Sequence, residues 1–169
     1  MTDHIEESPP GDLSREQLLG MYRRMRLIRA FEDTAQEYFE AGEIGGFLHL
    51  SQGQEAVPVG TCTALRGDDY ITSTHRGHGD VLAKGCEVKY MFAELYGRTT
   101  GYCKGKGGSM HIADFGQGII GANGIVSGGL PIITGIGLSI KMRGTDQVLS
   151  LIHISEPTRP ELVSRMPSS

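Results

Sequence analysis

The spacing of apolar positions near the start of the chain predicts one long amphipathic helix. Ser14 is followed three residues later by Gln17, which is the spacing of a capping box at a helix N-terminus. Apolar residues then recur at intervals of three or four, with Gly42 as a stop signal. These residues are Leu18, Met21, Tyr22, Met25, Ile28, Phe31, Ala35, Tyr38 and Phe39. We expect the aromatic members of this stripe to pack in a core.

A helix, a short strand and a second amphipathic helix are expected in the middle of the chain. After an extended stretch, a helix is predicted from about Gln54 to the turn in the segment RGDD, and Tyr70 to Thr72 has the pattern of a short strand. The segment CEVKYMFAELYG then places apolar side chains on one helical face, namely Val88, Met91, Phe92 and Leu95.

A long stretch without charged side chains separates Asp114 from Lys141, and its length alone would allow it to cross a bilayer. It is crowded with glycine and contains several polar residues, which make its insertion into lipid unfavourable. We expect a tight turn at Gly121 to Gly124, followed by a buried helix that ends at about Met142. Glycines in that helix cost about 1 kcal/mol each relative to alanine, so we expect a ligand or another backbone to pack closely there.

Composition narrows the class of protein. The 169 residues are enough for one domain with a core. A formal net charge of -4 and the lack of tryptophan argue against a surface that binds nucleic acid. The three cysteines, Cys62, Cys86 and Cys103, are scattered without a CxxC pair, and the polar, acidic start has no signal-peptide pattern. We therefore expect a cytoplasmic protein that binds neither nucleic acid nor membrane.

The segment THRGHGD carries the first candidate chemistry. Arg76 lies between His75 and His78, and glycines flank the second histidine. Arginine offers a planar set of donors that suits phosphate, and glycine lets the backbone approach a ligand closely. On the residues alone, an anion site and a polar turn without a ligand both remain open. A metal site at His75, His78 and Asp80 is disfavoured because no fourth ligand has the usual spacing.

The segment GRTTGYCKGKGGSMHI is a second, basic loop rich in glycine. It lacks the spacing of a Walker loop, which disfavours a nucleoside triphosphatase. Lys104, Lys106 and the backbone N–H groups of Gly107 and Gly108 offer one possible anion nest. On the residues alone, we favour a flexible and solvated loop.

Five segments occur in the order and at the spacing of a known family. They are MYRRMRLIRAFED, GFLHLSQGQEAVPVG, DDYITSTHRGHGD, YGRTTGYCKGKGGSMHIAD and GANGIVSGGLP. From about Leu13 to Val148 the chain resembles the alpha subunit of thiamine-diphosphate-dependent 2-oxo-acid and acetoin dehydrogenases, the first components of lipoyl-linked multienzyme complexes. The resemblance implies an α/β fold, here an incomplete three-layer α/β/α thiamine-diphosphate-binding fold with a parallel sheet.

The resemblance also implies roles for individual residues. His75 and Arg76 match the positions that face the diphosphate of the cofactor. Gly124 and Val126 match the positions whose backbone meets the aminopyrimidine ring, and His49 matches the catalytic histidine near the substrate and the thiazolium ring. A histidine that titrates near neutral pH suits proton exchange with an oxygen whose charge changes.

Ser109 and His111 match a loop that lines the active site close to the beta subunit. The implied partners are that beta subunit, in a heterotetramer, and a lipoyl-bearing acyltransferase that accepts the two-carbon unit. The implied cofactors are thiamine diphosphate and Mg²⁺, but the GDG turn and later asparagine that ligate the metal in this family are missing, so no metal ligand is assigned. Acetoin is the preferred substrate because THRGHG and GGSMHIAD are closer to that type. Pyruvate or another 2-oxo acid is the alternative.

The chain is expected to divide into a disordered start over 1–12, the amino-terminal part of the cofactor-binding domain over 13–148 and a non-native tail over 149–169. Residues 149–159 match the translation of an adapter used in transposase-made sequencing libraries, and 164–169 resemble its outer end. A natural short variant is the disfavoured alternative. We expect the activity to belong to a longer parent protein, and this fragment to expose apolar sheet edges and to be inactive alone.

Two functions of other classes are also considered. One is a non-catalytic anion-binding or assembly module that kept the cofactor-like loops. The other is a membrane-associated fragment that uses the uncharged stretch, which the glycine content disfavours.

Overall fold

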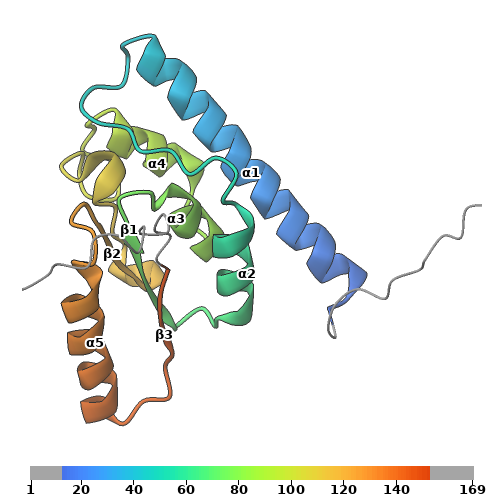
Figure 1. The fold of residues 1–169 in the computed structure, drawn as a ribbon, viewed down its shortest axis with the longest axis vertical. Helices are drawn as coiled ribbons and strands as arrows, with labels where there is room; N and C mark the ends of the chain where they lie inside the picture. The colour runs from blue at the N-terminus through green and yellow to red at the C-terminus, as the bar shows by residue number, and fades with distance from the viewer. Residues whose placement is uncertain (1–12, 153–169) are drawn as a thin grey trace, which may run out of the picture.

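The computed structural model describes residues 13–152 of the 169-residue chain. The expected disordered start, and all but residues 149–152 of the expected non-native tail, lie outside the described residues. In chain order the helices and strands are α1 (Arg15–Glu40), α2 (Ala56–Ala64), β1 (Tyr70–Thr74), α3 (His78–Lys84), α4 (Val88–Leu95), β2 (Ile119–Asn123), α5 (Gly129–Arg143) and β3 (Leu149–Leu151) (Figure 1). Two 3₁₀ turns, η1 (Gly108–Met110) and η2 (Phe115–Gln117), precede β2.

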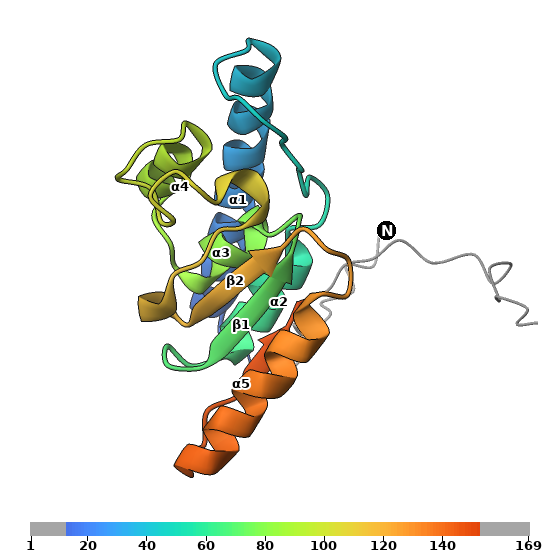
Figure 2. The same cartoon turned by 90° about the vertical axis from the view of Figure 1, so that its left-hand side faces the viewer.

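A parallel sheet of three strands in the order β2-β1-β3 lies at the centre of the molecule. Helix α5 packs on one side of this sheet, and α1, α2 and α3 lie on the other (Figure 1, Figure 2). The expected α/β fold with a parallel sheet is therefore confirmed. Within the described residues the sheet is not closed, in agreement with an incomplete three-layer arrangement.

Helix α1 begins where its capping box predicts. The Gln17 backbone N–H donates to Ser14 Oγ at 3.2 Å, and the Ser14 N–H donates to Gln17 Oε1 at 2.8 Å. The expectation for its aromatic stripe is only partly right. Phe31 is buried, but Tyr22 is 56% exposed and Phe39 is 36% exposed. The two ends of α1 extend beyond the body of the fold, and its fully buried residues lie in its middle, between Ile28 and Ala35 (Figure 1).

The expected turn at Gly121 to Gly124 is wrong, because residues 119–123 form strand β2. The glycine has another local role here. The pairing of β1 with β2 shifts register between Ile71 and Thr72, whose partners are Ile119 and Gly121. Gly121 has a φ of 144°, which glycine tolerates and other residues rarely adopt. Gly121 therefore permits the register shift between β1 and β2, and β2 continues to Asn123.

Helix α5 lies where a helix was expected, but it is not buried. Its buried residues are Gly129 and Ile140, whereas Leu138 is 57% and Met142 79% exposed. A Cβ atom on Gly129 would lie 3.1 Å from the Leu151 side chain, so close packing explains that glycine. Nothing lies within 4 Å of a Cβ atom built on Gly135. In the described part of the chain, no helix has the length and apolar character needed to cross a membrane.

Strand β3 begins at Leu149, the first residue of the segment expected to be non-native. It pairs in parallel with β1 through Tyr70 opposite Leu149 and Thr72 opposite Leu151. The core lies between the sheet and the helices on the side of α1. Its fully buried apolar residues include Ile28, Val59, Ile71, Val81, Met91, Ile112 and Ile119.

Candidate functional site

The ends of β1 and β2 bring two of the predicted cofactor segments together. Thr74, the last residue of β1, is paired with Asn123, the last residue of β2. Because the two strands are parallel, the residues that follow them leave the sheet at the same edge, which is where α/β proteins commonly bind ligands. The pair His75 and Arg76 therefore leaves the sheet beside Gly124.

Arg76 is half-buried and is held at two points. Its backbone N–H donates to Thr74 Oγ1 at 3.3 Å, and its Nη1 donates to the backbone carbonyl of Leu50. A guanidinium has several further N–H donors in one plane, so this contact leaves donors available for an anion. The Leu50 contact also brings the segment that contains His49 next to the end of β1.

His49 packs against His75. Their ring centroids lie 5.3 Å apart with the rings at 89°. The backbone N–H of His49 donates to Ser109 Oγ at 3.1 Å. Its Nδ1 is buried and has no hydrogen-bond partner within residues 13–152. A buried polar atom without a partner is costly, so this atom is suited to a hydrogen bond with a ligand.

A buried polar network lies beneath this cluster. His78 is 0% exposed, with Nδ1 3.1 Å from Glu32 Oε2 and Nε2 2.8 Å from Ser109 Oγ. The Ser51 hydroxyl donates to the other Glu32 oxygen at 2.6 Å. If Nδ1 of His78 carries the proton and donates to the carboxylate, Nε2 accepts from the Ser109 hydroxyl. The network joins α1, α3 and η1.

Neither His78 nor Glu32 was predicted as a site residue. A signal was present, because Glu32 interrupts the apolar stripe of the first helix between Phe31 and Ala35. A fully buried carboxylate at such a position needs a partner. The sequence does not say which partner, because His78 is far from Glu32 along the chain.

Metal ligation by His75, His78 and Asp80 was disfavoured. In the structure two of these side chains make hydrogen bonds within the protein. His78 lies between Glu32 and Ser109, and Asp80 accepts the hydroxyl of Ser73. Burial raises the pKa of Asp80 to about 7, although the Ser73 hydrogen bond opposes that shift. Within residues 13–152, no three His, Cys, Asp or Glu side chains are grouped so as to hold a metal.

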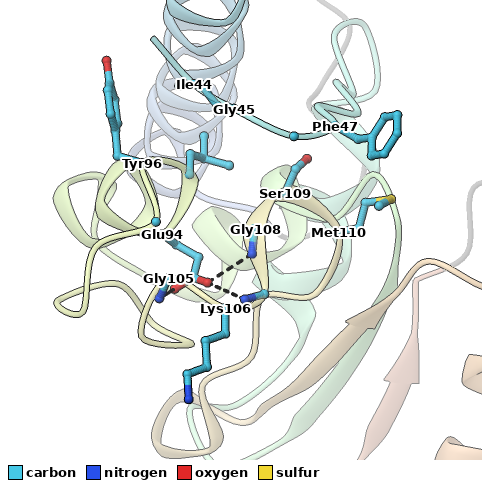
Figure 3. A pocket seen from close by; sticks show the side chains of 14 residues that line it. Ile44, Gly45, Phe47, Glu94, Tyr96, Gly105, Lys106, Gly108, Ser109 and Met110 are labelled. Carbon is cyan, nitrogen blue, oxygen red and sulfur yellow. Dashed lines mark hydrogen bonds between the residues drawn. The ribbon is translucent and has the colours of Figure 1, made fainter.

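The basic loop forms an anion nest, but its anion is a side chain of the protein itself. Glu94 accepts the backbone N–H group of Cys103 at 2.8 Å. It also accepts those of Gly105 at 2.9 Å, Gly107 at 2.7 Å and Gly108 at 3.1 Å (Figure 3). The favoured expectation of a free, solvated loop is therefore wrong. The alternative of a nest for a bound phosphate is also wrong, because Glu94 takes these donors.

A pocket of about 380 Å³ lies beside this loop. Its walls are residues 44–47, the end of α4 and residues 105–110, and Ser109 and Met110 lie at one side of it (Figure 3). His49, His75 and Arg76 do not line it. We therefore do not assign it to the diphosphate.

His111 and Gly124 are in close contact. A Cβ atom on Gly124 would lie 3.2 Å from Cε1 and 3.3 Å from Nε2 of His111, and Nδ1 of His111 lies 3.4 Å from the carbonyl oxygen of Ala122. This contact joins the loop that carries Ser109 to the end of β2. Val126 lies between β2 and α5 and is 60% exposed, so the structure does not bring its side chain into the cluster formed by the others.

Comparison with known proteins identifies one family, by a family model and by individual relatives. Residues 23–153 match the family model described as "Dehydrogenase E1 component". The alpha subunit of acetoin:2,6-dichlorophenolindophenol oxidoreductase from Bacillus subtilis (strain 168) is 53% identical over 136 residues, which cover 80% of this chain and 41% of that protein. The protein of the same name from Cupriavidus necator is 48% identical over 143 residues, covering 85% of this chain and 43% of that protein.

A relative with a different substrate in its name is also similar. The alpha subunit of the pyruvate dehydrogenase E1 component from Rickettsia felis is 40% identical over 135 residues, which cover 80% of this chain and 41% of that protein. The chain thus spans about two fifths of the length of these relatives. The family match runs a few residues past Val148, where we placed the end of family-like sequence.

Proposed function

Because the chain belongs to the dehydrogenase E1 component family, we propose that residues 13–148 are the amino-terminal part of the alpha subunit of a thiamine-diphosphate-dependent dehydrogenase. The proposed reaction cleaves acetoin and passes the two-carbon unit to a lipoyl group. Acetoin is preferred because the two relatives named for it share more identical residues with this chain than the relative named for pyruvate. Pyruvate is the alternative substrate.

The residues at the ends of β1 and β2 fit a diphosphate. Arg76 is anchored to the Leu50 carbonyl, which fixes the guanidinium while further donors stay available. We propose that Arg76 and His75 bind the diphosphate, and that the backbone at Gly124 and Val126 meets the aminopyrimidine ring. When bound, thiamine diphosphate supplies a carbon nucleophile and an electron sink for cleavage of the bond next to a carbonyl.

The buried Nδ1 of His49 is the observation that supports a catalytic role for this residue. We propose that this atom exchanges a proton with the substrate oxygen whose charge changes during the reaction. The His75 ring and the Ser109 hydroxyl fix the position of His49, because they contact its ring and its backbone N–H. Ser109 and His111 would then line the active site near the partner subunit.

Parts of the proposed site come from outside this chain. The proposed partners are a beta subunit, in a heterotetramer, and a lipoyl-bearing acyltransferase. We propose that Mg²⁺ would be held together with the diphosphate by oxygen ligands from a part of the longer protein outside residues 13–148, and that the fragment alone would be inactive. The three cysteines are unpaired, which favours a reducing compartment such as the cytoplasm.

The direct test is turnover by the full-length alpha subunit assembled with its beta subunit. Reduction of 2,6-dichlorophenolindophenol would be followed with acetoin or pyruvate, with and without thiamine diphosphate and Mg²⁺. We expect reduction that requires the cofactor and is faster with acetoin. Faster reduction with pyruvate would support the alternative substrate. No reduction with either substrate would favour the non-catalytic module.

A further inference from the structure

The Glu94 carboxylate is enclosed by the loop that follows α4. The residue is 1% exposed, and both of its oxygens accept backbone N–H groups. Oε2 accepts from Cys103 and Gly105, and Oε1 accepts from Gly107 and Gly108. A buried carboxylate is costly unless its oxygens are hydrogen-bonded, so the loop and the carboxylate stabilise each other.

The backbone of the loop is shaped to aim its N–H groups inward. Lys104, Gly105 and Gly108 have φ values of 58°, 74° and 59°, in the left-handed region. Room is also scarce inside the loop. A Cβ atom on Gly101 would lie 2.5 Å from Glu94 Oε2, and one on Gly105 would lie 2.3 Å from the carbonyl carbon of Gly97. Gly101 is therefore explained by contact with Glu94, and Gly105 by contact with the backbone that follows α4.

Ser109 follows this loop directly and is 5% exposed. Its hydroxyl lies 2.8 Å from His78 Nε2 and accepts the backbone N–H of His49 at 3.1 Å. Hydrogen bonds weaken steeply when distance or angle departs from the optimum, so a displacement of Gly108 would loosen both contacts. The path from Glu94 to His49 thus consists of the hydrogen bond from Gly108 to Glu94, one covalent step from Gly108 to Ser109, and the hydrogen bond from His49 to Ser109.

We propose that Glu94 is a positioning residue that closes the loop Cys103–Gly108 and thereby fixes Ser109 where it holds His49. Glu94 itself touches no substrate in this account. The proposal rests on the proposed function in one respect, namely that His49 takes part in catalysis.

Glu94→Gln is the test variant, because glutamine has nearly the same size but its amide nitrogen cannot accept an N–H group. Lys104 and Lys106 are exposed within the loop and provide trypsin sites. In the full-length protein with its beta subunit, we expect cleavage after these lysines, located by mass spectrometry, to be about tenfold faster than in the parent. We expect kcat for acetoin to fall about tenfold, with KM within about twofold of the parent value.

Two further variants separate the proposed effect from a general loss of structure. Gly105→Ala opens the loop without altering the carboxylate, because its Cβ would collide with the backbone at Gly97. It should reproduce the faster cleavage and the lower kcat, even if Glu94→Gln fails to fold. Glu37→Gln changes an exposed glutamate of α1 and should match the parent in both measurements.

Each outcome decides the proposal. Faster cleavage together with lower kcat supports it. Unchanged cleavage in folded Glu94→Gln would overturn it, and so would faster cleavage with unchanged kcat. If the unsubstituted full-length protein turns over neither acetoin nor pyruvate, the proposed function has failed. Hydrogen exchange of the His49 amide then decides the positioning role, with about tenfold faster exchange in Glu94→Gln as support and unchanged exchange as refutation.

Discussion

The hydroxyl of Ser109 lies 2.8 Å from Nε2 of His78, and neither residue is accessible to solvent beyond a few per cent. This contact joins the loop after α4 to the first turn of α3. Through Glu32, on the other side of the His78 ring, it also reaches α1. The network therefore fixes the relative positions of the segments that carry the proposed site, and it makes His78 the most informative position for a stability measurement.

His78→Ala should destabilise the protein by about 2–4 kcal/mol, because it leaves the buried Glu32 carboxylate without its histidine partner and creates a cavity. Urea-induced unfolding of the full-length protein, followed by circular dichroism, measures this loss. His111→Ala is the matched control, because His111 is exposed, and it should change stability by less than about 0.5 kcal/mol. A loss below about 1 kcal/mol for His78→Ala would contradict a structural role for the network.

Asp80→Asn should change how stability depends on pH. Burial raises the pKa of Asp80 to about 7 from its ordinary value of 3.8. Between these values the folded protein holds a proton that the unfolded chain has released, so stability falls as pH rises through this window. Below about pH 4 this penalty is absent, and above about pH 7 it is fully present. The asparagine has no such proton, so the variant should lack this penalty.

Unfolding of parent and variant at a series of pH values gives the measurement. The stability gained by Asp80→Asn should grow between pH 4 and pH 7, on the order of 2–4 kcal/mol in total, and then remain constant. Asp68→Asn is the control, because the Asp68 side chain is 63% exposed, and it should follow the parent within about 0.5 kcal/mol. A variant curve parallel to that of the parent would show that Asp80 does not titrate in this range.

His49→Ala should lower kcat for dye reduction with acetoin on the order of a hundredfold, because it removes the proposed proton-exchanging group. The Kd for thiamine diphosphate should stay within about twofold, since His49 is not proposed to bind the diphosphate. Gln52→Ala is the control, because the exposed Gln52 side chain donates a hydrogen bond to Asp33 of α1. Equal turnover in His49→Ala and the parent would remove His49 from the catalytic residues.

Gly124→Ala should weaken thiamine diphosphate binding about threefold to tenfold. The added methyl group would press on the His111 ring at 3.2 Å, where the loop and the end of β2 meet. Gly135→Ala is the control, because nothing lies within 4 Å of its Cβ position and it is in a helix. It should leave the affinity unchanged and stabilise the protein by about 0.5–1 kcal/mol. Titration calorimetry and thermal melting check the two expectations, and equal affinities in both variants would contradict the Gly124 assignment.

Local sequence signals predicted the fold well where the cause is local. The capping box of Ser14 and Gln17 fixed the start of α1, and the strand after the RGDD turn was placed correctly, although it continues to Thr74. The role of Gly121 was missed because its φ value depends on pairing with β1, a relationship that a single segment does not contain. The burial of α5 was overestimated because its apolar residues say nothing about which layer would cover them.

In the candidate site too, some features were predicted from the sequence and others depend on contacts between distant segments. The resemblance placed His49, His75 and Arg76 in one site, and the structure brings the three together. Their roles remain predictions. For the glycine-rich loop a flexible, solvated segment was favoured and an anion nest was only the alternative, and the sequence does not distinguish a bound phosphate from a carboxylate such as that of Glu94. That distinction depends on the distance between α4 and the loop, which only the folded chain reveals.

Diphosphate binding by Arg76 is tested by the affinity of Arg76→Ala for thiamine diphosphate, measured by calorimetric titration of the full-length protein with Mg²⁺ and the proposed beta subunit present. Charge-assisted hydrogen bonds from a guanidinium contribute about 1.5–3 kcal/mol, so we expect binding that is about tenfold to a hundredfold weaker, with a much smaller effect on the stability of the fold. Arg23→Ala, on the exposed face of α1, should bind as the parent does. An Arg76→Ala variant that binds the cofactor as tightly as the unsubstituted protein would show that Arg76 does not hold the diphosphate.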